Sequence, residues 1–164
     1  MTHKGLSNRI RYPDARLAGV EAIFELIRIE PQWRPDPITK DTLKALGIAR
    51  GKETNTLFAL GFLGVIDGGG SPTKEFDSLR NDFSSTLKRL VHSSYALLFQ
   101  TIPVSRANQE SLVRFFRTDG YSEETAEYQA KLFVKLCNDA GIALPIAEVT
   151  FKRARFRRGA APRD

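Results

Sequence analysis

Apolar residues recur every three or four positions between residues 14 and 30, a spacing typical of one buried helical face. The four apolar residues with this spacing are Leu17, Val20, Phe24 and Ile27. Asp14 precedes them and is predicted to cap the helix. Prolines 31, 35 and 37 favour an extended connection afterwards, and residues 1–13 are expected to form a loose arm. The chain is thus predicted to begin with an amphipathic helix.

The next segment predicts two helices separated by a tight turn. Thr39 has the residue type that caps a helix, and Leu43 and Leu46 are expected on the inner face of that helix. Gly47 follows, a residue that readily takes the left-handed conformation that ends a helix. A further helix is predicted over residues 51–63. This order is that of a helix-turn-helix.

A short hairpin is predicted directly after these helices. Residues 65–66 indicate a strand, and the run of Asp67 and three glycines indicates a turn. Thr73 is then predicted to cap a short helix that ends near Leu79. The spacing from Leu46 to Val65 resembles the winged helix-turn-helix of bacterial regulators, including those of the MarR type.

The second half of the chain predicts helices throughout. One begins at Ser84 or Ser85 and continues to the region of Leu98, and a second covers residues 108–117. Ser122 is predicted to cap a final helix that Gly141 ends, with Glu123 and Glu124 near its positive end. Its buried face is expected to hold Ala126, Ala130, Phe133, Val134 and Cys137.

These elements predict a mainly α-helical fold. We expect a winged helix-turn-helix over residues 14–80, made of three helices and a β-hairpin wing, packed against a small helical part over residues 84–142. Residues 146–164 are expected to form a flexible basic tail. The length of 164 residues and an apolar content of 41% suffice for a hydrophobic core.

Four polar side chains are predicted to face a DNA groove at the start of the second helix of the motif: Arg50, Lys52, Thr54 and Asn55. Arginine and lysine reach phosphates or guanine, and asparagine reads adenine. Phe58 and Phe62 lie one turn apart on the face that such a helix presents outward, which favours packing against the second half of the chain or against a partner. Glu53 and Thr56 occupy positions that are usually apolar in this motif.

The net charge of +6 is concentrated at the C-terminus. Residues 1–151 hold 19 basic and 18 acidic side chains. Residues 39–80 alone hold six basic and five acidic side chains, so this segment has little net charge with which to neutralise phosphates. Five basic residues of the tail are candidate nucleic-acid contacts: Lys152, Arg153, Arg155, Arg157 and Arg158. The alternatives left open are RNA and a merely solvated end; no membrane partner is expected, because no strong amphipathic helix precedes the tail.

No enzyme is predicted, and no cofactor, metal or small-molecule substrate is expected. The two histidines have no catalytic neighbour in sequence, and the cysteine and histidine spacings match no metal site. Cys137 falls on an apolar helical face. A single cysteine favours a reducing cytoplasm, and no apolar run is long enough to span a bilayer.

The segments TLFALGFLGVIDGGGSPT and SLVRFFRTDGYSEETAEYQAKLFVKLC, with VEAIFELIR before them, resemble a bacterial domain-of-unknown-function family, number 5343 in that series. The likeness covers about residues 20–142, and residues 64–73 are its most specific part. It implies a small bacterial protein with a winged-helix-like first half and supplies no catalytic residues.

Two functions are therefore expected. The first is a non-enzymatic DNA-binding protein that uses the winged helix and the basic tail. The second is a protein-interaction adaptor or homodimer in which Phe58 and Phe62 meet the partner.

Overall fold

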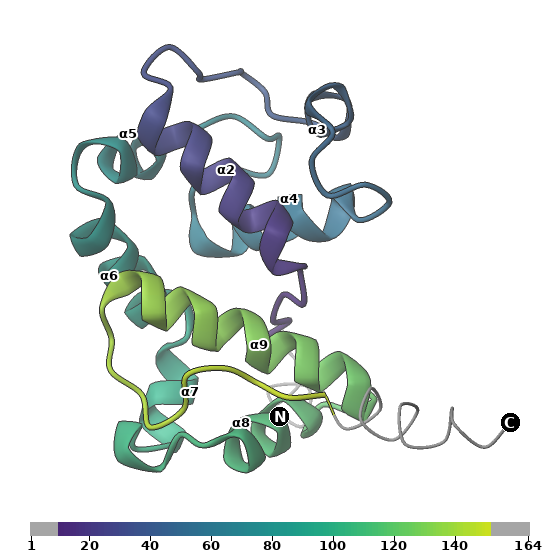
Figure 1. Cartoon of the computed structure of the whole chain (residues 1–164), viewed down its shortest axis with the longest axis vertical. Helices are drawn as coiled ribbons and strands as arrows, with labels where there is room; N and C mark the ends of the chain where they lie inside the picture. Colours follow the sequence, from purple (N-terminus) through teal and green to yellow (C-terminus); the bar gives the residue numbers. More distant parts are fainter. Residues whose placement is uncertain (1–9, 152–164) are drawn as a thin grey trace, which may run out of the picture.

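The computed structural model describes residues 10–151, which form α-helices joined by loops and one short 3-10 helix (Figure 1). Helices α2 to α5 lie together at one end of the molecule, and α6 to α9 form the other end. The helices are α2 (Leu17–Ile29), α3 (Lys40–Leu46), α4 (Glu53–Leu63), α5 (Lys74–Asn81), α6 (Phe83–Ser94), α7 (Ala96–Thr101), the 3-10 helix η1 (Val104–Arg106), α8 (Gln109–Arg117) and α9 (Glu123–Ala140).

Helix α3 begins and ends where the sequence predicts. The Thr39 side chain accepts from the Thr42 backbone N–H, and the Thr42 hydroxyl accepts from the Thr39 N–H in return, which completes a capping box. Gly47 ends the helix with a left-handed φ of 69°. Leu43 is fully buried as expected. Leu46 is 46% exposed, so its prediction as an inner residue is wrong.

Helices α2 and α4 approach each other closely at Gly19. A Cβ added there would lie 2.7 Å from the Thr56 Oγ1 atom and 2.9 Å from the Ala49 Cβ atom. Thr56 is fully buried at this contact. A polar residue occupies a usually apolar position of the motif here because its small side chain fits between the two helices.

The predicted β-hairpin wing is absent, which corrects the fold expected from the sequence. Residues 10–151 contain no β-strand, and the segment after α4 makes one isolated antiparallel bridge between Ile66 and Pro72. The ladder does not extend, because the Val65 N–H donates to the Leu60 carbonyl at the end of α4 and α5 begins directly after Thr73. The Gly70 carbonyl, in the turn, accepts from the Ile38 N–H at 2.8 Å. Thr73 then caps α5 by accepting from the Glu75 N–H, as predicted.

The segment before α2 is packed, and two expectations for it are corrected. Asp14 does not cap α2; its carboxylate accepts from the Asn55 side-chain amide at 3.0 Å. Residues 10–13 form no loose arm, because Tyr12 and Pro13 are buried. The Tyr12 ring lies 5.6 Å from Tyr95 and 5.6 Å from Phe62, between centroids, so it joins the two ends of the molecule.

The second half is helical as predicted, with one difference. The single helix expected after Ser84 is two helices, α6 and α7, which meet at Tyr95, and α6 begins earlier, at Phe83. Tyr95 is fully buried against Phe133 of α9, with ring centroids 4.8 Å apart. Ser122 caps α9 and Gly141 ends it. No helix within residues 10–151 is long and apolar enough to cross a lipid bilayer.

Candidate functional site

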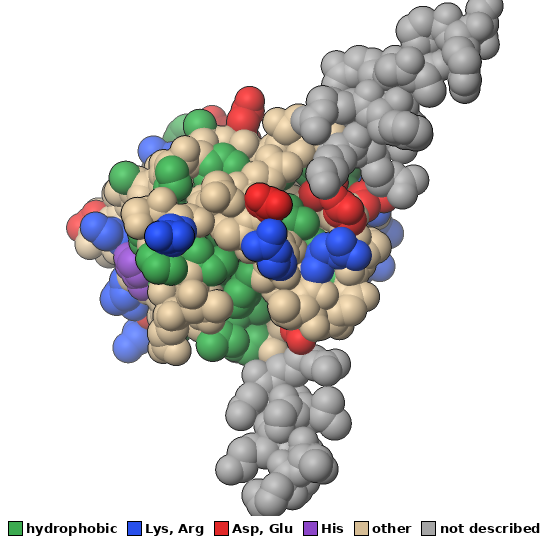
Figure 2. Space-filling view, turned by 90° about the horizontal axis from the view of Figure 1, so that it is seen from below, with side chains coloured by type: hydrophobic (Ala, Val, Ile, Leu, Met, Phe, Trp, Pro, Cys, Tyr) green, Lys and Arg blue, Asp and Glu red, His purple; other side chains and the backbone are tan. Residues whose placement is uncertain are grey.

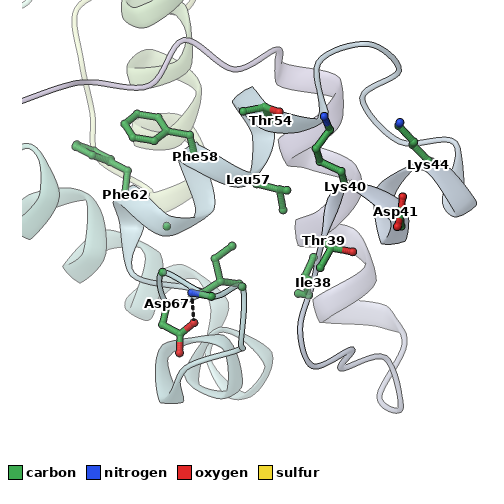
Figure 3. A pocket seen from close by; sticks show the side chains of 15 residues that line it. Ile38, Thr39, Lys40, Asp41, Lys44, Thr54, Leu57, Phe58, Phe62 and Asp67 are labelled. Carbon is green, nitrogen blue, oxygen red and sulfur yellow. Dashed lines mark hydrogen bonds between the residues drawn. The ribbon is translucent and has the colours of Figure 1, made fainter.

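A groove of about 740 Å³ opens between α3, α4 and the loop that follows α4 (Figure 3). The floor comes from the outward face of α4, one wall from the start of α3, and the other wall from residues 66–70. Its lining is mainly apolar: Ile38, Leu57, Phe58, Gly61, Phe62 and Ile66 contribute to it. A mainly apolar concavity on a surface is a common sign of a binding site.

Gly61 leaves the middle of the groove floor open. It lies inside α4, where glycine costs about 1 kcal/mol relative to alanine. It is exposed, and a Cβ built on it would meet no atom within 4 Å. The fold itself therefore does not require glycine at this position. Its effect is to leave room between the Leu57, Phe58 and Phe62 side chains for atoms of another molecule.

The two phenylalanines of the floor are held in place by the rest of the chain. Phe62 is partly buried, with its ring centroid 5.1 Å from that of Tyr95. Phe58 is also partly buried, and the Arg11 guanidinium lies 4.5 Å from the centre of its ring. Both rings nevertheless line the groove. A floor that is already ordered loses little conformational entropy when a ligand binds.

The far wall is a loop closed by its own hydrogen bonds. The Asp67 Oδ1 atom accepts from the backbone N–H groups of Gly69 and Ser71, both at 2.9 Å. The Gly70 carbonyl accepts from Ile38 on the opposite side of the groove. Gly70 has a φ of 89°, and a Cβ there would lie 2.6 Å from the Ile38 carbonyl oxygen. Glycine is thus required where the loop meets residues 37–38.

The near wall carries charge. Lys40 and Lys44, one turn apart on α3, are both exposed and line the groove together with Asp41. Neither lysine makes an ion pair with any other part of residues 10–151. A hydrogen bond from its own backbone N–H is the main cause that lowers the pKa of Glu53, and the charges of Lys44 and Lys40 lower it further. The Glu53 carboxylate also accepts from the Gly51 N–H, which lies just before α4.

These bonds from backbone N–H groups explain how an acidic residue is accommodated at a usually apolar position of the motif. Glu53 is only 7% exposed, and it begins α4 two residues later than the sequence predicts. A carboxylate at a helix N-terminus satisfies free N–H groups and interacts favourably with the helix dipole.

The residues predicted to contact DNA are partly brought together. Arg50, Lys52 and Thr54 are exposed around the N-terminal end of α4. Asn55 is partly buried, and its side-chain amide donates to the Asp14 carboxylate, so this side chain already has a partner within the protein. Thr54 also lines the groove. The candidate DNA edge and the groove therefore share one helix.

The tail residues predicted to bind nucleic acid lie outside the described part of the chain: Lys152, Arg153, Arg155, Arg157 and Arg158. The segment leading to them is anchored. Gln109 donates to the Thr150 carbonyl and accepts from the Thr150 N–H. The Phe151 ring lies 4.5 Å from that of Tyr128 on α9. Thr150 and Phe151, the last described residues, are thus held against α8 and α9.

Basic residues do not gather into one patch on the face shown in Figure 2. Lys and Arg side chains occupy separate places there, with hydrophobic, acidic and uncharged atoms between them. Among the ion pairs of the described residues, Arg117 pairs with Glu123 and Arg114 with Glu110. A broad electrostatic surface for a polyanion is not seen on this face.

Other chemically reactive groups are structural or isolated. Cys137 is fully buried, and burial raises the pKa of its thiol to about 12. The exposed His92 ring packs on Phe99, with 4.6 Å between ring centroids. Within residues 10–151 no three His, Cys, Asp or Glu side chains gather to hold a metal ion.

The sequence singles out Phe58 and Phe62 but not Gly61, Lys40 or Lys44, which shape the same groove. One signal was available: a glycine within a helical run needs an explanation. The lysines had no comparable signal, because their position beside α4 depends on how α3 packs.

Comparison with known proteins finds a family and nothing more specific. No curated protein and no solved structure matches the chain. A family model, described as a family of unknown function (DUF5343), matches residues 16–144. These residues include α2 to α9 and therefore the whole groove. The chain belongs to the DUF5343 family.

Proposed function

We propose that this protein is a protein-interaction adaptor whose α3–α4 groove receives a helix of a partner protein. The observation that supports this proposal most is the outward face of α4, where the Leu57, Phe58 and Phe62 side chains surround Gly61, which leaves space above the helix. A helix that read DNA with this face would present polar groups to the bases. An apolar groove favours instead the apolar stripe of an amphipathic helix.

The dimensions of the groove agree with a short helical ligand. Helix α4 has 11 residues and is roughly 16 Å long, so about three turns of a partner would cover it. The volume of about 740 Å³ is enough for several large apolar side chains. The aromatic contacts of Phe62 and the closed loop at Asp67 keep the site open before binding.

A labelled synthetic helix tests this proposal. The probe is an amphipathic peptide of about 14 residues with leucines three and four positions apart and glutamine on its other faces. We expect the full chain to bind it and the variant Gly61→Gln to bind at least about tenfold more weakly, because the added side chain fills the groove floor. Gly61→Ala is the matched control, since it changes the helix similarly but adds one carbon.

Fluorescence anisotropy measures the affinity, and amide chemical shifts locate the peptide. The proposal requires shifts in α3, α4 and residues 66–70. No binding at about 1 mM peptide, or binding that Gly61→Gln leaves unchanged, would refute it.

DNA binding is a second candidate function, favoured by a separate observation. Arg50 and Lys52 are exposed at the N-terminal end of α4, Lys40 and Lys44 are exposed on α3, and the candidate tail contacts add further charge. The test is binding of a random duplex across a salt series by the full chain, a chain ending at Phe151, and Arg50→Gln/Lys52→Gln. Loss of salt dependence on truncation, with further loss in the double variant, supports this candidate. Failure of all three to bind at low salt eliminates it.

A further inference from the structure

We infer that the partner helix of the α3–α4 groove is acidic on one flank only, the flank that lies against α3. This inference rests on the proposed docking function and adds the partner's chemistry and its orientation. The inference is drawn from the difference in charge between the two walls of the groove. The docking proposal, by contrast, is drawn from the apolar floor.

The α3 wall is positive. Lys40 and Lys44 lie at positions i and i+4, so their ammonium groups project from one side of the helix (Figure 3). Both are exposed and form no ion pair within residues 10–151. Arg50 and Lys52, which precede α4, are also exposed but do not line the groove. Asp41 is the acid that lines this wall.

The loop wall has the opposite character. It holds no lysine or arginine, and its one charged residue is Asp67. The Asp67 Oδ1 atom faces the loop backbone, where it accepts two hydrogen bonds. The other residues of this wall are Ile66 and three glycines, whose backbone leaves little to attract an acidic side chain.

A helix in this groove therefore meets unlike electrostatic environments on its two flanks. Carboxylates spaced i and i+4 on the α3 side would each lie near one lysine, whereas carboxylates on the loop side would lie near Asp67. Because the charges differ between the walls, they fix which flank faces α3, and hence the direction of the helix. The charges of both lysines act on Glu53, but neither forms an ion pair within residues 10–151, so binding a carboxylate there breaks no ion pair.

Three peptides with the same leucines test the inference. The first has glutamine on both flanks, the second has glutamates at i and i+4 on one flank, and the third has lysines at those positions. We expect the glutamate peptide to bind about tenfold more tightly than the glutamine peptide at low salt, and the lysine peptide to bind more weakly. The difference should shrink at about 0.5 M salt, where the Debye length is a few ångströms.

Two variants assign the effect to α3. Lys40→Gln/Lys44→Gln should bind the glutamate and glutamine peptides equally, with the glutamine peptide bound as by the unaltered chain. Lys74→Gln/Lys88→Gln removes the same charge from exposed positions outside the groove and should keep the tenfold preference. If both double variants reduce the preference alike, general charge attraction explains it and the inference is wrong.

The outcomes separate this inference from the proposed function. Groove binding of the glutamine peptide without a preference for glutamate overturns the inference and leaves the adaptor function standing. Absence of groove binding by all three peptides overturns both. A concentration-dependent dimer, seen by sedimentation and abolished by Gly61→Gln, identifies the occupant as a second copy and also overturns the inference.

Discussion

Replacing Gly70 with alanine should destabilise the protein by about 2–3 kcal/mol, because two independent constraints meet at this residue. Its φ of 89° lies in the left-handed region, which costs an L-residue about 1–2 kcal/mol. The new Cβ would also lie 2.6 Å from the Ile38 carbonyl oxygen, a backbone atom that cannot rotate away. Relief of that contact moves the loop and weakens the 2.8 Å hydrogen bond from Ile38 to Gly70, worth about 1 kcal/mol.

Gly68→Ala is the matched control. Gly68 lies in the same loop, its φ is outside the left-handed region, and a Cβ there meets no atom within 4 Å. Both substitutions reduce the entropy of the unfolded chain equally, so this contribution of about 0.4–1 kcal/mol cancels between them. The comparison therefore isolates the folded-state constraints at Gly70.

Urea unfolding followed by circular dichroism measures the difference. With a denaturant slope of about 2 kcal/mol/M for a chain of this size, Gly70→Ala should unfold about 1–1.5 M earlier than Gly68→Ala. Coincident midpoints, within about 0.2 M, would refute the reasoning that Gly70 is held by its backbone angle and by Ile38.

Three further outcomes follow from single contacts. Arg80→Met should cost about 2–3 kcal/mol in urea unfolding, because the Arg80 guanidinium donates to the backbone carbonyls of Ile27, Glu30 and Trp33, and Arg80→Lys should not restore the loss. Thr39→Ala should cost about 1 kcal/mol by removing the α3 cap, whereas Thr39→Ser should keep most of it. The thiol of Cys137 has a pKa raised from about 9 to about 12, so above pH 9 the unfolded chain loses a proton that the folded chain keeps. The free energy of unfolding should then fall by about 1.4 kcal/mol by pH 10 relative to Cys137→Ala; a parallel pH profile in the two proteins would contradict this.

The helices and their ends could be predicted because they depend on nearby residues. Thr39 and Ser122 each accept from an N–H three residues ahead, and Gly47 and Gly141 take left-handed angles at helix ends. Such contacts lie within one turn, so the residue types determine them directly. The apolar face of α9 was predictable for the same reason, since its period follows from helix geometry.

Other features were decided by residues distant in sequence. The Ile38 N–H bonds to the Gly70 carbonyl across 32 positions, and the Asp14 carboxylate binds Asn55, 41 positions away, whereas α2 begins after Arg16. Tyr12 is buried because aromatic residues of both ends of the molecule surround it. The sequence alone determined which segments are helical, and it pointed to Phe58 and Phe62, the two phenylalanines that line the groove. Only tertiary packing placed α3 beside α4 and so formed the groove. The walls of the groove come from different segments of the chain, and no local sequence pattern specifies the distance between those segments.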